Sequence, residues 1–212
     1  MQKYFFDFDG TLVDSKKRVY TLFRKIVLAM RPGDENLIPD FNTYWYYKRN
    51  FMNQSMLLQF FMKFTSTEVQ MFKNRWLDEI EEFELLKLDT PFEGIKDVLE
   101  LLSGNSDLIL VSARQFSDRL IAQLNWLDWR KYFSLVLVTN QLRSKDSIIR
   151  DTVDFSCDDF FFGDTGEDID AAKSLGIRSI AVDTGFIALD RLQKHLPWRC
   201  ANSVYHYFML NN

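Results

Sequence analysis

Four short apolar runs in the second half of the chain constrain its fold most. They lie at residues 108–113, 134–139, 159–163 and 178–184. Because consecutive positions in each run are apolar, the strands should be buried on both faces, as in a parallel sheet. Amphipathic segments with helical spacing separate the runs. This alternation predicts an α/β fold in which right-handed crossovers connect parallel strands.

Residues 15–89 follow a different pattern, with no strand candidate. Apolar residues recur at helical spacing from Val19 to Met30, and Pro32 then ends the helix. We therefore expect an all-helical unit at residues 15–89, inserted into an α/β core formed by residues 1–14 and 90–212.

Two further helical regions are expected in this insertion, the first at roughly 41–63. The region 41–63 is rich in aromatic residues and methionine, which favours packing in a core. A third helix should begin near Thr65, because Glu68 follows at the spacing of a capping box, and its apolar stripe continues to Phe83.

Composition excludes several classes of protein. With 47% hydrophobic residues the chain can bury a large core, and a net charge of −4 argues against a nucleic-acid binder. Its two cysteines are far apart in sequence, which favours a reduced, cytoplasmic protein. No run of about 18 apolar residues occurs, so no membrane-spanning segment is expected.

Polar residues stand where the predicted strands end. The stretch KYFFDFDGTLVDS, residues 3–15, reads as a first strand that ends in two acids, Asp7 and Asp9. Their i, i+2 spacing predicts that both side chains point to the same side. Parallel sheets bind ligands beyond the carboxyl ends of their strands. The other polar residues expected there are Ser112, Lys145, Asp164 and Asp168.

The expected cluster of carboxylates calls for a cation. Acids that are brought together stay ionised only if a positive charge offsets their repulsion. Hard oxygen ligands at an open, partly hydrated site suit Mg²⁺. We therefore expect Mg²⁺ as the cofactor.

The stretch Asp7–Ser15 (DFDGTLVDS) resembles the first signature of the haloacid dehalogenase-like phosphatase superfamily. Ser112, Lys145 and the acids in GDTGED (163–168) follow in an order similar to the family's other motifs. The resemblance spans nearly the whole chain. It implies a Rossmann-like α/β core, and the insertion resembles the helical cap of the phosphoglycolate phosphatase-like branch.

The resemblance also implies roles for these residues. Asp7 would be the nucleophile that forms an aspartyl-phosphate, and Asp9 would be the general acid and base. The phosphoryl oxygens would be held by Thr11, Ser112 and Lys145. The Mg²⁺ ligands would be Asp7, Asp9 (through its backbone carbonyl), Asp164 and Asp168. The implied activity is Mg²⁺-dependent hydrolysis of a small phosphate monoester of the phosphoglycolate, sugar phosphate or nucleotide type.

Some assignments stay open at this level. Arg143 is an alternative to Lys145, because the family often has proline after this lysine and Asp146 follows here. Asp168 is spaced to cap a helix that begins at Thr165, besides serving a metal.

Asp9 argues against dehalogenase chemistry. A phosphomutase and a catalytically silent regulatory or binding module are the alternative functions, and either a monomer or a homodimer is compatible with the sequence.

The insertion should choose the substrate. Residues 15–75 contain eleven Lys and Arg against four Asp and Glu, which suits an anionic partner such as a small phosphorylated metabolite, although a solvated helix face explains the same count. The segment YYKRN (46–50) lies roughly where related caps carry a specificity loop. We therefore expect Arg49 to contact the remote end of the substrate.

Overall fold

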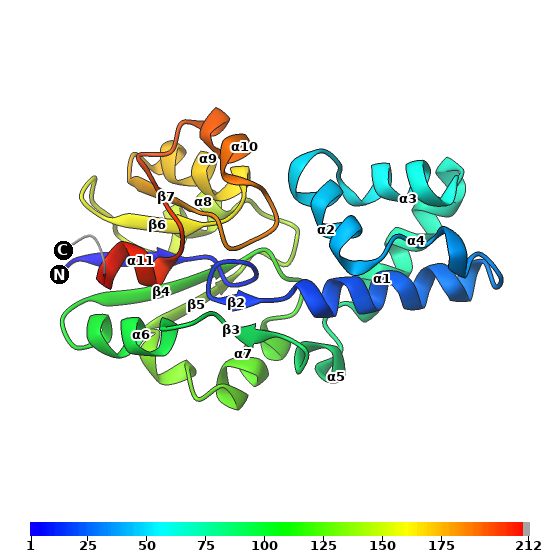
Figure 1. Ribbon diagram of the computed structural model, residues 1–212. Coiled ribbons are helices and arrows are strands. Elements are labelled where there is room, and N and C mark those ends of the chain that lie inside the picture. The colour runs from blue at the N-terminus through cyan, green and yellow to red at the C-terminus, as the bar shows by residue number, and fades with distance from the viewer. Residues whose placement is uncertain (210–212) are drawn as a thin grey trace. The chain divides into compact units, whose positions relative to one another are not determined.

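The computed structural model describes residues 1–209 and divides into two compact units (Figure 1). The core unit comprises Met1–Asp14 and the chain from Thr90 onward, and the helical unit comprises Ser15–Asp89. No helix in the described part of the chain is long and apolar enough to cross a membrane.

A six-stranded sheet forms the centre of the core unit, in the order β5-β4-β1-β6-β7-β8. All of its pairings are parallel. Its strands are β1 (Lys3–Phe6), β4 (Asp107–Ser112), β5 (Leu135–Val138), β6 (Phe160–Gly163), β7 (Arg178–Val182) and β8 (Arg199–Ala201). The predicted α/β class and its parallel strands are confirmed, with β1 between β4 and β6.

Helices cover both faces of this sheet. They are α6 (Ile95–Ser103), α7 (Ser117–Trp126), α8 (Lys145–Thr152), α9 (Gly166–Leu175), α10 (Leu189–Leu192) and α11 (Val204–Met209), with short 3₁₀ turns at Arg130–Tyr132 and Gln193–His195. Side chains of β1 alternate between the two apolar layers. Phe5 packs with Ile149 and Leu175 of α8 and α9, whereas Phe6 lies in the layer that includes α6 and α7.

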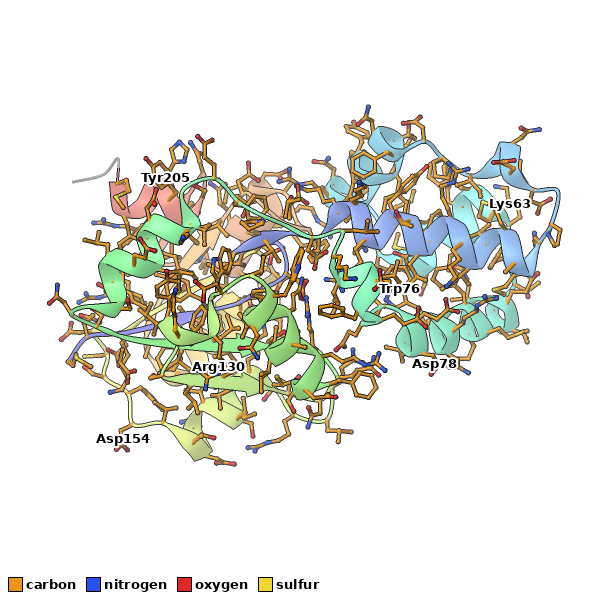
Figure 2. The ribbon with its side chains drawn as sticks, turned by 90° about the horizontal axis from the view of Figure 1, so that it is seen from below. Lys63, Trp76, Asp78, Arg130, Asp154 and Tyr205 are labelled. Atoms are coloured by element: carbon orange, nitrogen blue, oxygen red, sulfur yellow. The ribbon has the colours of Figure 1, made fainter. Side chains whose placement is uncertain are left out.

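The first turn of α11 packs closely against the start of α6. Gly94 precedes α6 with a φ of +71°, and a Cβ there would lie 2.0 Å from the ring of Tyr205, which is labelled in Figure 2. Glycine is therefore required at position 94, both for its backbone conformation and for the approach of the ring.

Several details of the core differ from the sequence expectations. Ile121 was expected on the buried stripe of α7 but is 37% exposed, and Phe116 rather than Ser117 occupies the N-cap. The sequence pattern also missed β8 and a two-residue antiparallel ladder between β2 (Val13–Asp14) and β3 (Thr90–Pro91). These strands are too short to produce a period of alternating hydrophobicity.

The helical unit contains no strand among its residues 15–89, all of which the structure describes. Its helices are α1 (Lys16–Met30), α2 (Phe41–Asn50), α3 (Gln54–Met62), α4 (Ser66–Glu79) and α5 (Phe83–Leu86), with a 3₁₀ turn at Glu35–Leu37. The helical region expected at about 41–63 consists of two helices, because the Asn53 side chain accepts a hydrogen bond from the Met56 amide and starts α3.

The predicted capping box at the start of α4 is present. Thr65 accepts from the Glu68 amide, and the Glu68 carboxylate accepts from the Thr65 amide at 2.8 Å. The helix ends at Glu79, before the expected Phe83.

Aromatic rings fill the interior of this unit. The Phe23 centroid lies 4.8 Å from that of Tyr44 and 5.9 Å from that of Phe72, so these rings pack a core.

Candidate active site

The first acid of the DFDGT stretch lies directly after β1. The backbone amide of Asp7 donates to the Phe162 carbonyl at 2.9 Å, which continues the pairing with β6. The chain then turns at Gly10, whose φ is +89°. A Cβ at Gly10 would lie 2.5 Å from a carboxylate oxygen of Asp164, and one at Gly185 only 1.8 Å from it. Both glycines therefore make room for the Asp164 side chain.

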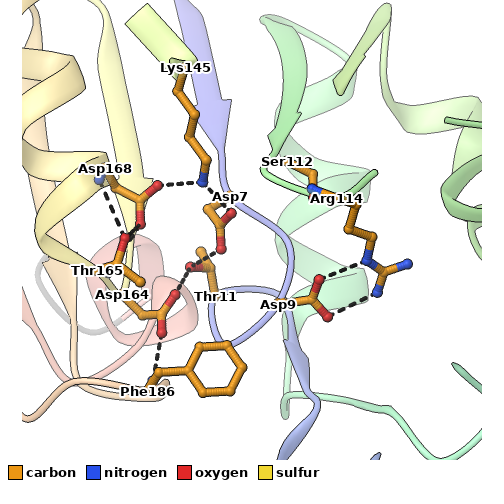
Figure 3. A network of polar contacts seen from close by, with 10 residues as sticks. All are labelled: Asp7, Asp9, Thr11, Ser112, Arg114, Lys145, Asp164, Thr165, Asp168 and Phe186. Atoms are coloured by element: carbon orange, nitrogen blue, oxygen red, sulfur yellow. Dashed lines mark hydrogen bonds and ion pairs between the residues drawn. The ribbon is translucent and has the colours of Figure 1, made fainter. Parts of the chain in front are cut away.

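Three buried acids meet at this edge of the sheet (Figure 3). Asp7 follows β1, Asp164 follows β6 and Asp168 lies in the first turn of α9. Each offers a carboxylate oxygen, and these atoms lie within 4.8 Å of one another. Such a set of buried carboxylate oxygens fits a hard divalent cation such as Mg²⁺.

One lysine faces this cluster. Lys145 is the first residue of α8, and its Nζ lies 2.5 Å from an oxygen of Asp7 and 2.5 Å from an oxygen of Asp168. Burial lowers the pKa of Lys145, but Asp168 and Asp7 outweigh it and hold that pKa above its usual value. The lysine is therefore charged, and a single positive charge stands against three carboxyl groups.

The excess of acids shows in their pKa values. Burial raises the pKa of Asp7 to about 7, although Lys145 acts in the opposite direction. Burial, together with the charges of Asp7 and Asp168, also raises the pKa of Asp164 well above its usual range. A divalent cation bound between these groups would favour their ionised forms.

Asp168 both caps a helix and faces the cluster. Its Oδ2 accepts from the Thr165 amide at 3.0 Å and from the Thr165 hydroxyl at 2.6 Å, which completes a capping box. Its Oδ1 points instead to Lys145. The two readings of the sequence are thus compatible, because each carboxylate oxygen has a different partner.

Thr11 and Ser112 place hydroxyl groups at the carboxyl ends of β1 and β4. The Thr11 hydroxyl lies 3.3 Å from an oxygen of Asp7 and 3.3 Å from an oxygen of Asp164. Ser112 is buried at the end of β4, the strand next to β1, and its hydroxyl accepts from the Arg114 amide at 3.3 Å. Asp164 is further fixed by the Phe186 amide, which donates to it at 2.6 Å.

Asp9 lies differently from the expectation. Its carboxylate turns away from Asp7 and meets Arg114, whose Nε and Nη2 donate to its two oxygens at 2.7 and 2.9 Å (Figure 3). The i, i+2 argument was wrong for these side chains because β1 ends at Phe6, so the alternation of a strand does not extend to Asp9. The sequence reasoning also missed Arg114. The sequence feature that could have indicated Arg114 is its position two residues after Ser112, the serine that ends a buried strand.

The remaining two candidate residues lie apart from the acid cluster or in the other unit. Arg143, the alternative to Lys145, donates to the Ser147 carbonyl at 3.0 Å and pairs with Asp151, so Lys145 is the cation in contact with Asp7. Arg49 is half-buried in the last turn of α2, within the helical unit.

Comparison with known proteins identifies relatives of this arrangement. The family model described as haloacid dehalogenase-like hydrolase matches residues 4–182. No curated protein is significantly similar to the chain in sequence.

Solved structures share the fold at low identity. A structure described as a putative phosphatase from Clostridium difficile has a TM-score of 0.77 at 19% identity, covering 97% of this chain and 96% of its own. A predicted phosphoglycolate phosphatase from Haemophilus somnus gives 0.70 at 18%, covering 100% and 98%. A putative β-phosphoglucomutase from Thermotoga maritima gives 0.67 at 19%, covering 97% and 96%.

Proposed function

The chain belongs to the haloacid dehalogenase-like hydrolase family, and we propose that it is a Mg²⁺-dependent phosphatase acting on a small phosphate monoester. The observation that carries this proposal is the buried cluster of Asp7, Asp164 and Asp168 with Lys145 as the cation in contact with it. Three acids and one lysine leave an excess of buried carboxyl groups at the end of the central strand. A divalent cation and a phosphoryl group would together complete such a site.

Asp7, Asp164 and Asp168 are the side chains that would hold Mg²⁺, with the Asp9 carbonyl as a further ligand. The bound ion would neutralise charge on the phosphoryl group, so that an anionic carboxylate can approach an anionic ester. Lys145, Thr11 and Ser112 would hold the phosphoryl oxygens. Lys145 is suited to this role because it is fully charged and its ammonium is already directed at Asp7.

Hydrolysis would take two steps at Asp7. A carboxylate oxygen of Asp7 attacks phosphorus, the bond from phosphorus to the ester oxygen breaks, and Asp9 gives that oxygen a proton. Water then attacks the phosphorus of the aspartyl-phosphate while Asp9 takes a proton from it. Inorganic phosphate leaves and Asp7 is regenerated.

The test of the proposal is hydrolysis of p-nitrophenyl phosphate with and without Mg²⁺, in the wild type and in Asp7→Asn. We expect activity that needs Mg²⁺ and falls by at least about ten-thousandfold in Asp7→Asn, because the amide is not a nucleophile. Asp190→Asn, at an exposed position of α10, is the matched control and should retain activity. A folded wild type that turns over no phosphate ester with Mg²⁺ would contradict the proposal and favour a regulatory or binding module.

A panel of phosphoglycolate, sugar phosphates and nucleotides would then rank the substrates. Because the fold is also similar to a structure described as a putative β-phosphoglucomutase, phosphomutase activity is the second candidate function. Release of inorganic phosphate supports a phosphatase, whereas return of the phosphoryl group to another hydroxyl of a sugar phosphate would make the protein a phosphomutase.

We further propose that the helical unit is a cap that selects the substrate, with Arg49 contacting the substrate's remote end. Arg49→Ala should raise KM for the best substrate of the panel by roughly tenfold, with little change in kcat, because the contact would serve binding rather than the reacting atoms. Arg24→Ala is a suitable control, since this arginine pairs with Glu35 within the same unit. An unchanged KM in Arg49→Ala would remove Arg49 from the site.

A further inference from the structure

Arg114 makes a two-point contact with the acid that the proposed reaction uses for proton transfer. It lies two residues beyond the end of β4, in the segment that leads to α7. Its Nε and Nη2 donate to separate oxygens of Asp9 at 2.7 and 2.9 Å. This geometry fixes the plane of the carboxylate as well as its distance, which a point charge such as lysine cannot do.

Arg114 is itself held from three sides. Its Nη1 donates at 2.7 Å to the side-chain carbonyl of Gln123, a fully buried residue of α7. Its guanidinium lies 5.0 Å from the centroid of the Phe8 ring. Its backbone amide reaches the Ser112 hydroxyl. The arginine side chain is only 4% exposed, whereas that of Asp9 is 20% exposed, so a rigid buried group holds a more accessible one.

We propose that Arg114 is a positioning residue that holds Asp9 for proton transfer, and that Gln123 in turn holds Arg114. This inference rests on the proposed function, because it assigns Asp9 the role of acid and base. In each turnover Asp9 would act twice at the same place, first on the ester oxygen and then on water. A short side chain on a turn needs a fixed partner to return to one position.

The chemistry of arginine determines how the contact must change during the reaction. A guanidinium only donates hydrogen bonds, so an Asp9 oxygen that carries a proton cannot keep its contact with Arg114. One of the two bonds must therefore open while the other continues to hold the carboxylate. The oxygen that turns away gives its proton to the ester oxygen as the phosphorus–oxygen bond breaks. Once it has lost that proton, Asp9 can accept both bonds from Arg114 again. It then takes a proton from the attacking water, which opens one bond once more and leaves Asp9 protonated for the next turnover. Exchange of that proton with solvent restores the two-point contact of the free protein.

The leaving group provides the test. A p-nitrophenolate leaves phosphorus without a proton, whereas an alkoxide needs one, so only an alkyl phosphate depends on the position of Asp9 in the first step. We would measure single-turnover release of p-nitrophenol and of the alcohol from the best alkyl phosphate, both with Mg²⁺. In Arg114→Met the alcohol release should slow by about 100-fold, while p-nitrophenol release should slow by less than about threefold.

Conservative variants separate positioning from folding. Arg114→Lys keeps one charged donor, so it should recover a substantial part of the alkyl rate that Arg114→Met loses. Gln123→Leu should show the same preference for the aryl substrate, at about tenfold. Arg150→Gln, an exposed arginine of α8, should change neither rate. Thermal unfolding of each variant would establish that it is folded at the assay temperature.

The outcomes distinguish this inference from the proposed function. Equal slowing of both substrates, or no slowing, in folded Arg114→Met would overturn the role of Arg114 while leaving the phosphatase intact. Failure of Arg114→Lys to recover any of the alkyl rate would also contradict it. A wild type that releases neither product with Mg²⁺ would overturn the proposed function itself.

Discussion

The two units of this protein differ in how their buried acidic and basic side chains contact each other. In the helical unit, buried Arg18 donates to buried Asp89 at 2.9 Å and to the Ile80 carbonyl at 3.1 Å. In the core unit, Lys145 meets both Asp7 and Asp168, with Asp164 as a third buried acid close by. In the first contact one base meets one acid, and Glu81 is a second buried acid of that unit. In the second, one base meets two acids of a buried cluster of three.

This difference distinguishes buried charges that stabilise the fold from buried charges that are suited to binding a ligand. A buried pair that is balanced and hydrogen-bonded can persist without any ligand. A buried excess of one sign opposes folding, and such sites are often ones at which a ligand of opposite charge binds. The basic excess predicted for the insertion is also partly balanced within the helical unit, since several of its cations pair with acids there. These cations are Arg18, Arg24, Lys25, Arg31 and Arg75.

The largest expected effect comes from removing the buried cation of each unit. Arg18→Met and Lys145→Met should each lower the free energy of unfolding by about 3–5 kcal/mol, because each leaves buried carboxylates without their partner. Mg²⁺ should restore part of the stability of Lys145→Met and none of that of Arg18→Met, since the ion would bind among the acids of the core only. Urea unfolding with 10 mM EDTA, and then with Mg²⁺ in excess, would measure this.

The catalytic readout should separate the same two variants. Phosphatase activity per folded molecule should fall by at least about 100-fold in Lys145→Met and by much less in Arg18→Met, because only Lys145 would contact the phosphoryl group. The double variant Arg18→Met, Asp89→Leu serves as a control. It should recover part of the stability, since the Asp89 carboxylate that Arg18 contacts is removed as well. Equal recovery of both single variants with Mg²⁺ would remove the distinction between the units.

A smaller effect is expected in the pH dependence of stability without metal. Since the pKa values of Asp7 and Asp164 are raised in the folded state, the folded protein binds more protons than the unfolded chain from about pH 4 upwards. Both groups therefore contribute stability fully at low pH, and the contribution of Asp7 is lost as the pH rises through about 7. Glu68 in the helical unit has the opposite sign. Hydrogen bonds from the Thr65 amide, and then from Arg31, lower its pKa to about 2, so its contribution is lost only as the pH falls from about 4.5 towards 2.

Asp164→Asn isolates the core contribution. The free energy of unfolding in EDTA should fall more between pH 5 and pH 8 in the wild type than in Asp164→Asn, because only the wild type carries the raised pKa of Asp164. Denaturant curves at the two pH values would measure the difference. The same fall in both proteins would show that Asp164 does not carry an unfavourable charge.

The smallest effects compare the two capping boxes. Thr65→Ala and Thr165→Ala should each lower the free energy of unfolding by about 1 kcal/mol, because each removes the side-chain acceptor of a helix N-terminus. Only Thr165→Ala should also lower kcat/KM, by roughly tenfold, since Thr165 orients Asp168 beside Lys145. Matched losses of activity in the two variants would contradict the assignment of Asp168 to the site.

Features that depend on local sequence were predictable. The apolar runs identify five strands of the large sheet, which are β1, β4, β5, β6 and β7. Each capping box follows from an acid that stands three residues after a threonine. The DFDGT stretch and its order with the later motifs led to the family, and that prediction is confirmed. In these cases the signal and the structure it specifies lie within a few residues of each other, or at strand ends that the parallel sheet brings together.

Features that depend on distant partners were not predictable. The direction of Asp9 is set by Arg114, which lies 105 residues further along the chain, and by the end of β1 at Phe6. Similarly, Ile121 fits the apolar stripe of α7, but its side chain is 37% exposed. Neither outcome follows from periodicity, because both depend on which groups the fold places opposite them.

The central claim is that the excess of buried acids in the core unit exists to bind a divalent cation. Calorimetric titration of Mg²⁺ into the wild type, Asp164→Asn and Asp190→Asn tests it most directly, without any assumption about the substrate. We predict one Mg²⁺ bound per chain in the wild type and in Asp190→Asn, and at least about tenfold weaker binding in Asp164→Asn. No binding to the folded wild type, or equal binding to Asp164→Asn, would contradict the claim.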